Sequence, residues 1–462
     1  MRALRDPQRL LEEGLAAIRA QFSVPAGFPE EVLAAAQAAV ARVPTAHLDR
    51  TADAFVTLDP AGSSDLDQAF FLEAAGNDIL LHYAIADVPW FVDDGDPLDQ
   101  EAWRRGVTTY LPGGKASLYP PLLSEGAASL LPDGPRPAIV LTVRIGSGGE
   151  AALDGARRAV IRSRAKLAYE TVSDADLPPL FGALAERMAL AEARRGAARV
   201  DPPEQVVERD AAGHMTLRYR PWTLAETRNA AMSLAANLAV AEALYAAGTG
   251  LFRTMAPPNS AAEARLRQTA RAFALDWPDA MPLAQFERRL DPQHPADAAF
   301  MLAVRRAGNG AAYTTLQPGQ RPWHAAMAAT YAHATAPLRR LADRHVLRAV
   351  LAVAAGDPVP PAVTDAFVRL PAAMAKAEAR AGQVERAVID MAETALMTGL
   401  EGEDFAAVVT DIGETGARIQ LCDLPVVART RAPDVVPGDR LRVRLRAADP
   451  TRRTLHFDPV GE

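Results

Sequence analysis

Hydrophobic residues follow two different periods along the 462-residue chain. Residues 1–50 carry apolar positions at helical spacing and contain Ala-rich runs, which predicts helices. Farther on, the runs Phe55–Leu58, Ala69–Leu72 and Ile79–Ala86 have the dense apolar pattern of buried strands. The turn residues of Ala75–Asp78 lie between the last two runs and predict a β-hairpin.

The same alternation continues to the end of the chain. Residues 136–172 are again strand-like, residues 222–247 form an Ala/Leu-rich helical pattern, and helical periodicity dominates 260–400. The polar run Glu401–Asp404 interrupts the helices. Residues 405–460 then return to short strands separated by turns, a pattern and length typical of a five-stranded OB-fold barrel.

These changes of period predict an α+β protein with three parts. Residues 1–50 form a short helical region, residues 51–400 the main domain, and residues 403–462 a small β-barrel. A chain of 462 residues is also too long for a single compact core, which supports the division.

Composition limits the class of protein. No apolar stretch reaches the eighteen or so residues of a membrane span, so we expect no membrane association. The single cysteine, Cys422, excludes an internal disulfide and a cysteine-based zinc site, and a cytoplasmic location is expected. The net charge of −7 argues against a protein that coats nucleic acid non-specifically, but it does not exclude an enzyme with a basic channel.

Three carboxylates, Asp59, Asp65 and Asp67, follow a buried strand within nine residues. In extended backbone Asp65 and Asp67 point the same way, and Asp59 lies where a loop can fold back over them. Like charges this close favour a bound cation, and hard oxygen ligands suit Mg²⁺ or Mn²⁺. Two such ions stabilise the attacking and leaving oxygens in phosphodiester hydrolysis. The alternative interpretation is a polar turn with solvated carboxylates.

Around these aspartates the sequence resembles the ribonuclease II / ribonuclease R family, the RNB exoribonucleases. The family signature is a strand ending in Asp, five residues, Asp, one residue and Asp-Asp; Asp59, Asp65 and Asp67 match its first three carboxylates. Four further stretches resemble family motifs in the same order: His82–Val88, Arg105–Pro112, Arg194–Ala197 and Tyr331–Asp343.

The resemblance implies an RNB catalytic domain, with a mixed sheet surrounded by helices, followed by an OB-fold RNA-binding domain. It implies hydrolytic 3′→5′ exoribonuclease activity that releases nucleoside 5′-monophosphates with two Mg²⁺ ions, Mn²⁺ being the alternative. The expected partner is the 3′ end of single-stranded RNA, with structured RNA left open, and no obligate protein partner is inferred.

The resemblance also assigns roles to residues. Asp59, Asp65, Asp67 and Gln68 are expected to hold the metals, and Asp67, Arg339 and Arg340 to act in catalysis. An arginine pair after Pro337, a proline expected to stop a helix, could grip the scissile phosphate; a surface ion pair is the alternative. We expect His333 to be structural and Asp343 to pair with an arginine or cap a helix.

Two further regions are expected to contact RNA. Tyr110 precedes Leu-Pro, so it lies in extended backbone where its ring can stack on the terminal nucleotide; a half-buried core tyrosine is the alternative. In the C-terminal region, arginines alternate with apolar residues and share one strand face. That face is either a phosphate-binding groove or a solvated surface. Its arginines are Arg440, Arg442, Arg444 and Arg446.

The chain departs from the family pattern at several positions. Gln68 stands at the fourth aspartate and offers an uncharged oxygen, so one metal should bind more weakly. Ala230 and Ala231 replace a glutamate pair, for which Glu226, one turn earlier, is a candidate substitute. Val200 stands where an aromatic residue usually helps to clamp a base. Fifty N-terminal residues cannot hold the two cold-shock barrels usual in the family.

These departures leave rival hypotheses open. The first alternative is an RNA-binding member of the family whose catalysis is weakened or lost, because Gln68, Ala230 and Ala231 remove carboxylates. The second is an unrelated Mg²⁺-dependent phosphohydrolase that acts on small nucleotides and does not need the barrel.

Overall fold

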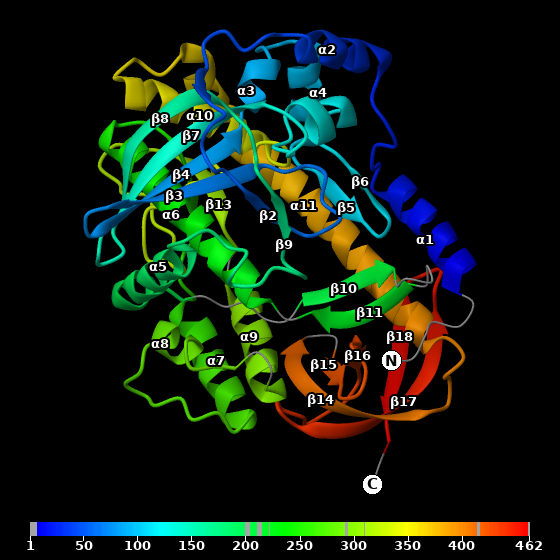
Figure 1. Cartoon of the computed structure of the whole chain (residues 1–462). Helices are drawn as coiled ribbons and strands as arrows, with labels where there is room; N and C mark the ends of the chain where they lie inside the picture. Colours follow the sequence, from blue (N-terminus) through cyan, green and yellow to red (C-terminus); the bar gives the residue numbers. More distant parts are fainter. Residues whose placement is uncertain are drawn as a thin grey trace.

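The computed structural model describes residues 7–198, 204–209, 215–220, 222–291, 294–308, 310–413 and 416–460. In Figure 1, a large α/β body lies above a separate small barrel, and one long helix runs from the first to the second. No helix of these residues is both long enough and apolar enough to cross a membrane.

A five-stranded mixed sheet forms the centre of the larger body. Its strand order is β1-β8-β7-β4-β3; β1 runs parallel to β8, and the other neighbours are antiparallel. The expected hairpin is present, and Gly76 adopts φ +62° at its turn, a conformation that favours glycine. The strands are β1 (Leu48–Arg50), β3 (Gln68–Ala75), β4 (Asp78–Ala86), β7 (Arg136–Ile145) and β8 (Ala151–Ile161).

Helices pack around this sheet and bury its apolar residues. The predicted Ala/Leu-rich helix is α6 (Leu224–Ala246), which contacts β7, β8 and α5 (Phe181–Arg195). It begins in a capping box in which Thr223 and Glu226 satisfy each other's backbone amides. α10 (Leu341–Ala355) packs on β8, on α6 and on α3 (Val88–Phe91). α3 and α4 (Pro97–Arg105) lie at the top of the larger body in Figure 1.

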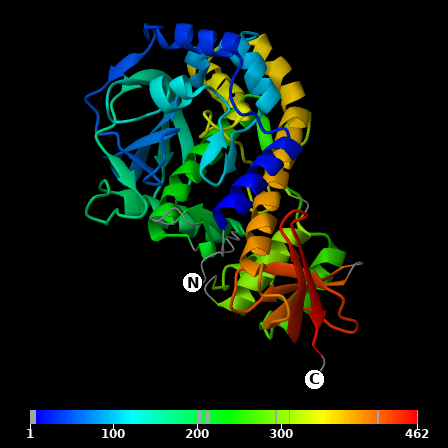
Figure 2. The ribbon, with the colours of Figure 1, turned by 90° about the vertical axis from the view of Figure 1, so that its right-hand side faces the viewer.

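The 37-residue helix α11 (Pro361–Met397) belongs to both hydrophobic cores. Its N-terminal half joins the core of the sheet through residues such as Leu370 and Met374, and its C-terminal half joins the core of the barrel through Val384 and Met391. Figure 2 shows α11 descending to the barrel with α1 (Pro7–Gln21) beside it, which agrees with their direct contact. The helix therefore fixes the two bodies relative to each other.

The predicted C-terminal barrel is confirmed. Five strands close in the order β14-β15-β16-β18-β17, as expected for an OB-like fold. Val409, Ile419, Val443 and Leu445 are completely buried in its interior. The strands are β14 (Asp404–Gly413), β15 (Gly416–Leu421), β16 (Val427–Thr430), β17 (Arg440–Asp449) and β18 (Thr454–Pro459).

Three details differ from the sequence-based expectation. Helices α1 and α2 (Glu30–Val40) lie within residues 1–50, but they join different cores and do not form one separate helical region. Within 260–400, β13 (Ala312–Thr315) is a strand, which pairs with β12 (Leu251–Thr254) through its backbone and is too short to alter the helical average. The helix that was expected to end at Pro337 is not present, and residues 316–340 are irregular.

The remaining elements complete the larger body. Two short two-stranded pairs, β2 with β9 and β5 with β6, lie beside the main sheet, and β10 with β11 lies between it and the barrel. These elements are β2 (Thr57–Asp59), β5 (Thr109–Leu111), β6 (Gly114–Ala116), the π-helix η1 (Leu123–Ala127), β9 (Lys166–Ala168), β10 (Glu204–Arg209), β11 (Met215–Arg220), α7 (Ser260–Ala272), α8 (Leu283–Glu287) and α9 (Pro295–Ala307).

A third, smaller core forms where α7, α8 and α9 meet around Trp277, Phe286 and Phe300. Glu287 ends α8 beside this core and is only 4% exposed. Burial raises the pKa of Glu287 to about 7, and the neighbouring Arg288 opposes the shift.

Stability should therefore depend on pH through Glu287. Because its pKa is raised in the folded state, its carboxyl ionises more readily in the unfolded chain, and stability is lost as pH rises from about 4.5 through 7. Glu287→Gln should raise the thermal unfolding midpoint at pH 8, by an amount equivalent to at most roughly 3 kcal/mol, and leave it nearly unchanged at about pH 4. The control is Glu186→Gln at an exposed position of α5. Equal effects of Glu287→Gln at both pH values would contradict this account.

Candidate active site

The acidic segment lies where β2 ends and the chain turns toward β3. β2 pairs in parallel with β9, and Asp59 is its last residue, at the strand end as expected. Burial raises the pKa of Asp59 to about 7; Asp67 and Asp65 raise it further, and Arg339 opposes the shift. The first and third predicted aspartates therefore interact electrostatically.

Asp67 is the most deeply placed carboxylate of the segment, at 5% exposure. It accepts a hydrogen bond from the backbone amide of Leu338 at 2.7 Å, and Arg339 Nε lies 3.4 Å from its other oxygen. Burial raises the pKa of Asp67 to about 7, although Arg339 and the Leu338 amide both oppose this shift. Asp67 thus holds a turn that is 271 residues away in sequence.

Tyr110 and Asp65 meet on the opposite side of the segment. Tyr110 is the middle residue of β5 and is 55% exposed, so its backbone is extended as predicted and its ring faces solvent. Burial around the hydroxyl and the adjacent Asp65 both raise the pKa of Tyr110. Across the hairpin, Lys115 places Nζ 2.7 Å from Asp65 and 3.1 Å from Glu125.

The hairpin that carries Tyr110 is tied to the arginine turn by backbone bonds. Thr108 N donates to Arg339 O at 3.0 Å, and Leu341 N donates to Gly106 O at 3.0 Å. Gly106 adopts φ +73°, and a Cβ there would lie 2.4 Å from the Cβ of Ala377 on α11. The glycine of the Arg-Gly motif is therefore required both by its conformation and by the close approach of α11.

Gln68, which the sequence predicts to help bind a metal, engages both ends of its amide in hydrogen bonds. Its Oε1 accepts hydrogen bonds from the Tyr83 hydroxyl and from Ser233 Oγ, the latter at 3.2 Å. Its Nε2 donates to Thr335 O at 2.6 Å. The side chain therefore joins the sheet, α6 and the segment before the arginine turn.

The two arginines of the motif have different environments. Arg340 forms a bidentate ion pair with Asp343, with N···O distances of 2.9 and 2.8 Å. Asp343 is completely buried and also accepts a hydrogen bond from Ala336 N. The expected pairing of Asp343 with an arginine is confirmed. Arg340 is thereby paired with Asp343 inside the protein. Arg339, whose side chain is 44% exposed, is the more accessible of the two arginines for a phosphate.

The other predicted positions lie around α6 and behind the turn. Glu226 accepts from Arg220 Nη1 at 2.6 Å and from Thr223 N at 2.7 Å, so its carboxylate is engaged at the start of the helix. Ala230 and Ala231 lie one turn later, where their methyl side chains carry no oxygen to replace a glutamate. His333 is partly buried against Tyr313, with Nδ1 2.9 Å from the hydroxyl, as expected for a structural histidine.

Sequence reasoning missed two cations at the site. Lys115 contacts Asp65, and Lys166 donates to the carbonyls of Ala61 and Ser63 at 2.8 and 2.6 Å, which holds the acidic loop. The chain contains only three lysines, and these are two of them. In a sequence that otherwise uses arginine, the rarity of lysine was the available signal.

The carboxylates of the site do not form a metal coordination sphere as they are placed. Within the described ranges, no group of three or more His, Cys, Asp and Glu side chains is placed to hold a metal ion. Asp65 instead contacts Lys115, and Asp67 contacts Leu338 and Arg339. The chemistry of these carboxylates suits a hard cation such as Mg²⁺.

The predicted arginine face of β17 is present. Val443 and Leu445 are buried, and the alternating arginines point outward. Two of the four are engaged, since Arg444 binds Asp404 through two hydrogen bonds and Arg446 pairs with Asp458 at 2.6 Å. Arg440 and Arg442 are exposed.

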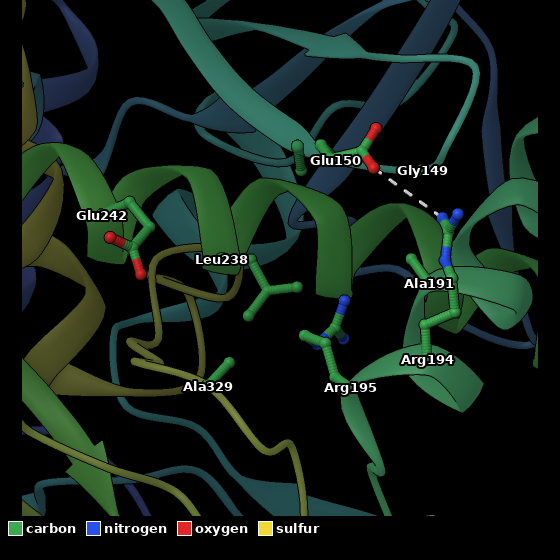
Figure 3. Close-up of a pocket in the computed structure, with 9 residues that line it drawn as sticks. Gly149, Glu150, Ala191, Arg194, Arg195, Leu238, Glu242 and Ala329 are labelled. Atoms are coloured by element: carbon green, nitrogen blue, oxygen red, sulfur yellow. Dashed lines mark ion pairs between the residues drawn. The ribbon is translucent and has the colours of Figure 1, made fainter.

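Arg194 and Arg195, the first residues of the family-like stretch Arg194–Ala197, line a cavity of about 370 Å³ between α5 and α6. Figure 3 shows Arg195 and Leu238 facing this hollow and Arg194 directed toward Glu150, 3.8 Å away. None of the predicted aspartates lines the cavity. Val200, the expected position of a base-clamping residue, lies outside the described residues.

Comparison with known proteins agrees with this fold. The family profile described as "RNB domain" matches residues 48–356, and the "RNase II-type exonuclease C-terminal S1 domain" matches 403–460. Exoribonuclease 2 of Cronobacter sakazakii is 29% identical over 83% of this chain and 62% of its own length. Ribonuclease R of Aquifex aeolicus is 26% identical over 87% of this chain and 60% of its own length. The chain thus spans about three fifths of these relatives.

A solved structure shares the fold. RNase R of Mycoplasma genitalium, in complex with ribose-methylated single-stranded RNA, superposes with a TM-score of 0.85 at 20% identity. The likeness covers 97% of this chain and 78% of that one.

The different environments of the two arginines predict different effects on stability. Arg340→Met leaves Asp343 buried without its partner, which should cost about 3–5 kcal/mol and lower the thermal unfolding midpoint clearly. Arg339→Met removes a half-exposed side chain and should change the midpoint little.

A double variant separates the effect of charge pairing from that of packing. Arg340→Met combined with Asp343→Asn removes both charges and should be more stable than Arg340→Met alone. Equal destabilisation by Arg339→Met and Arg340→Met would show that the two arginines are not divided in this way.

Proposed function

The chain belongs to the RNB family, and we propose that it is a hydrolytic 3′→5′ exoribonuclease that degrades single-stranded RNA to nucleoside 5′-monophosphates. The observation that supports this most is the contact of Asp67 with the arginine turn. This contact brings the exposed guanidinium of Arg339 beside the buried Asp67 and near the partly buried Asp59, within a family of nucleases.

Arg339 and Tyr110 would contact the RNA in this proposal. The guanidinium of Arg339 can form paired hydrogen bonds with the scissile phosphate and offset the charge that develops there. The exposed ring of Tyr110 can stack on the terminal base, and its position in the hairpin is fixed by the Thr108–Arg339 backbone bond. The two contacts are thereby held in register.

We also propose that Asp59, Asp65 and Asp67 bind Mg²⁺ or Mn²⁺ when RNA is present. The raised pKa values of Asp59 and Asp67 support this, because a nearby cation relieves the repulsion between buried carboxylates. A bound divalent cation supplies positive charge to the attacking and leaving oxygens. Gln68 is omitted from this set because its amide oxygen already accepts hydrogen bonds from two hydroxyl groups.

A second candidate function is RNA binding with weakened or lost catalysis. Gln68, Ala230 and Ala231 stand where the family pattern has carboxylates, so fewer charged ligands are available for a metal. The amide of Gln68 is also engaged in hydrogen bonds. Both candidates require binding of RNA and differ in turnover.

Replacing Asp67 separates charge from structure. Asp67→Asn retains an oxygen that can accept from Leu338 N, so the turn should keep its position, but it removes the negative charge. Turnover of RNA should fall on the order of 100-fold or more, while RNA affinity is kept. The matched control is Asp133→Asn, whose side chain is 68% exposed. Wild-type turnover in Asp67→Asn would refute the role of Asp67.

An assay on end-labelled RNA decides between the two candidates. An unstructured oligomer labelled at its 3′ end or at its 5′ end is incubated with the protein in Mg²⁺ or in Mn²⁺. The enzyme should release 3′ label at once as a mononucleotide and shorten the 5′-labelled strand stepwise. Intact RNA in both metals, together with measurable binding, would support the binding protein instead.

A further inference from the structure

A cavity of about 1000 Å³ lies at the junction between the larger body and the barrel. We call it the junction groove. Its walls come from α9 and α11 on one side and from the barrel strands β15, β16 and β18 on the other. In Figure 1, α9 and the end of α11 both lie next to these barrel strands. None of the predicted aspartates or β17 arginines lines the groove.

The junction groove concentrates arginines from four elements. Arg306 comes from α9, Arg386 from α11, Arg418 from β15 and Arg429 from β16. Arg418 and Arg429 are direct cross-strand partners, an arrangement in which like charges repel. Burial lowers the pKa of Arg306 and of Arg418, and neighbouring arginines lower both further.

The carboxylates in the described lining of the groove are fewer than its arginines. Seven arginines and four carboxylates belong to the described lining. Burial raises the pKa of Asp390, and it raises that of Glu393 to about 7, so Glu393 is only partly charged near neutral pH. Glu393 also accepts hydrogen bonds from Gln205 Nε2 and Val427 N. Asp458 pairs with Arg446 of β17. In the described part of the chain, neither Arg386 nor Arg418 has a carboxylate within ion-pair distance.

A second observation points to a ligand. The hydroxyl of Tyr219, on β11, lines the same groove and is buried without a hydrogen-bond partner among the described atoms. A buried hydroxyl with no partner is destabilising, and a phosphate or ribose oxygen would accept a hydrogen bond from it. Excess positive charge and an unsatisfied donor together favour a ligand with several anionic oxygens.

We propose that the junction groove binds the sugar–phosphate backbone of the RNA upstream of its 3′ end. This assignment rests on the proposed function above and adds a contact region that the β17 strand face does not provide. Arginine suits it because its planar fork binds phosphate oxygens in pairs. RNA is favoured over a small phosphorylated ligand because the arginines come from four separate elements around a cavity at the large end of the ligand-pocket range.

The test measures binding by the full chain that carries Asp67→Asn, without added divalent cation, so that cleavage is suppressed. The groove variant is Arg386→Gln with Arg418→Gln. The control, Arg265→Gln with Arg289→Gln, removes the same charge from exposed positions near the third core. The probes are labelled single-stranded RNAs of about 20 and about four nucleotides, since the short one cannot occupy the active site and the groove together.

The groove variant should bind the long RNA about tenfold or more weakly and the short RNA unchanged. The log–log slope of its affinity against salt should also become shallower, by about 0.7 for each phosphate that the variant no longer neutralises. Without RNA its thermal unfolding midpoint should not fall, because repulsion between arginines is removed. A lysine pair, Arg386→Lys with Arg418→Lys, keeps the charges and should bind long RNA at an intermediate level.

Three results would overturn the proposal. They are unchanged affinity for long RNA, an equal weakening for short and long RNA, and a groove that binds pyrophosphate while long-RNA affinity is unaffected. Because cleavage is not measured, failure of the proposed exonuclease activity would appear separately, as intact RNA with the unmutated chain.

Discussion

The buried carboxylate of Asp67 is the constraint on which the candidate site depends. It accepts the Leu338 amide and faces Arg339, so a residue at the end of the acidic loop fixes a turn that lies 271 residues later. The turn in turn fixes the hairpin of Tyr110 through backbone bonds to Thr108. Gln68, the next residue, adds a second tie to the same segment through Thr335 O. Neighbouring residues at the start of β3 therefore position both sides of the site.

Local patterns predicted the parts of the fold that depend on local periodicity. The hairpin of β3 and β4, the helix α6 and the strands of the closed barrel each bury apolar residues, and the spacing of these residues along the sequence identifies the element. Sequence could not assign the partners of polar side chains, because these are set by distant segments. Gln68 meets hydroxyls of Tyr83 and Ser233, and Arg340 meets Asp343 while its neighbour remains half exposed. Two adjacent arginines look equivalent in sequence and differ only once the turn is folded.

The net charge of −7 conceals a separation of charge within the molecule. Carboxylates gather at the end of β2, and arginines gather at the junction groove and on β17. The helix α11 belongs to both cores, so these two regions keep a fixed relation to each other. A polyanion with bound cations could interact favourably with both regions at once, which a uniform surface of the same net charge would not allow.

The same physics operates in the two regions with opposite sign. Asp59 and Asp67 lie close together in a buried place, and the raised pKa of each measures how unfavourable their charges are there. Arg418 and Arg429 lie opposite each other on adjacent strands, which is unfavourable for the same reason. Folding compensates the carboxylates only in part, since Arg339 and the Leu338 amide oppose a pKa shift that burial still dominates. Hydrophobic burial elsewhere must offset both, as is common where a protein keeps like charges together for a ligand of opposite charge.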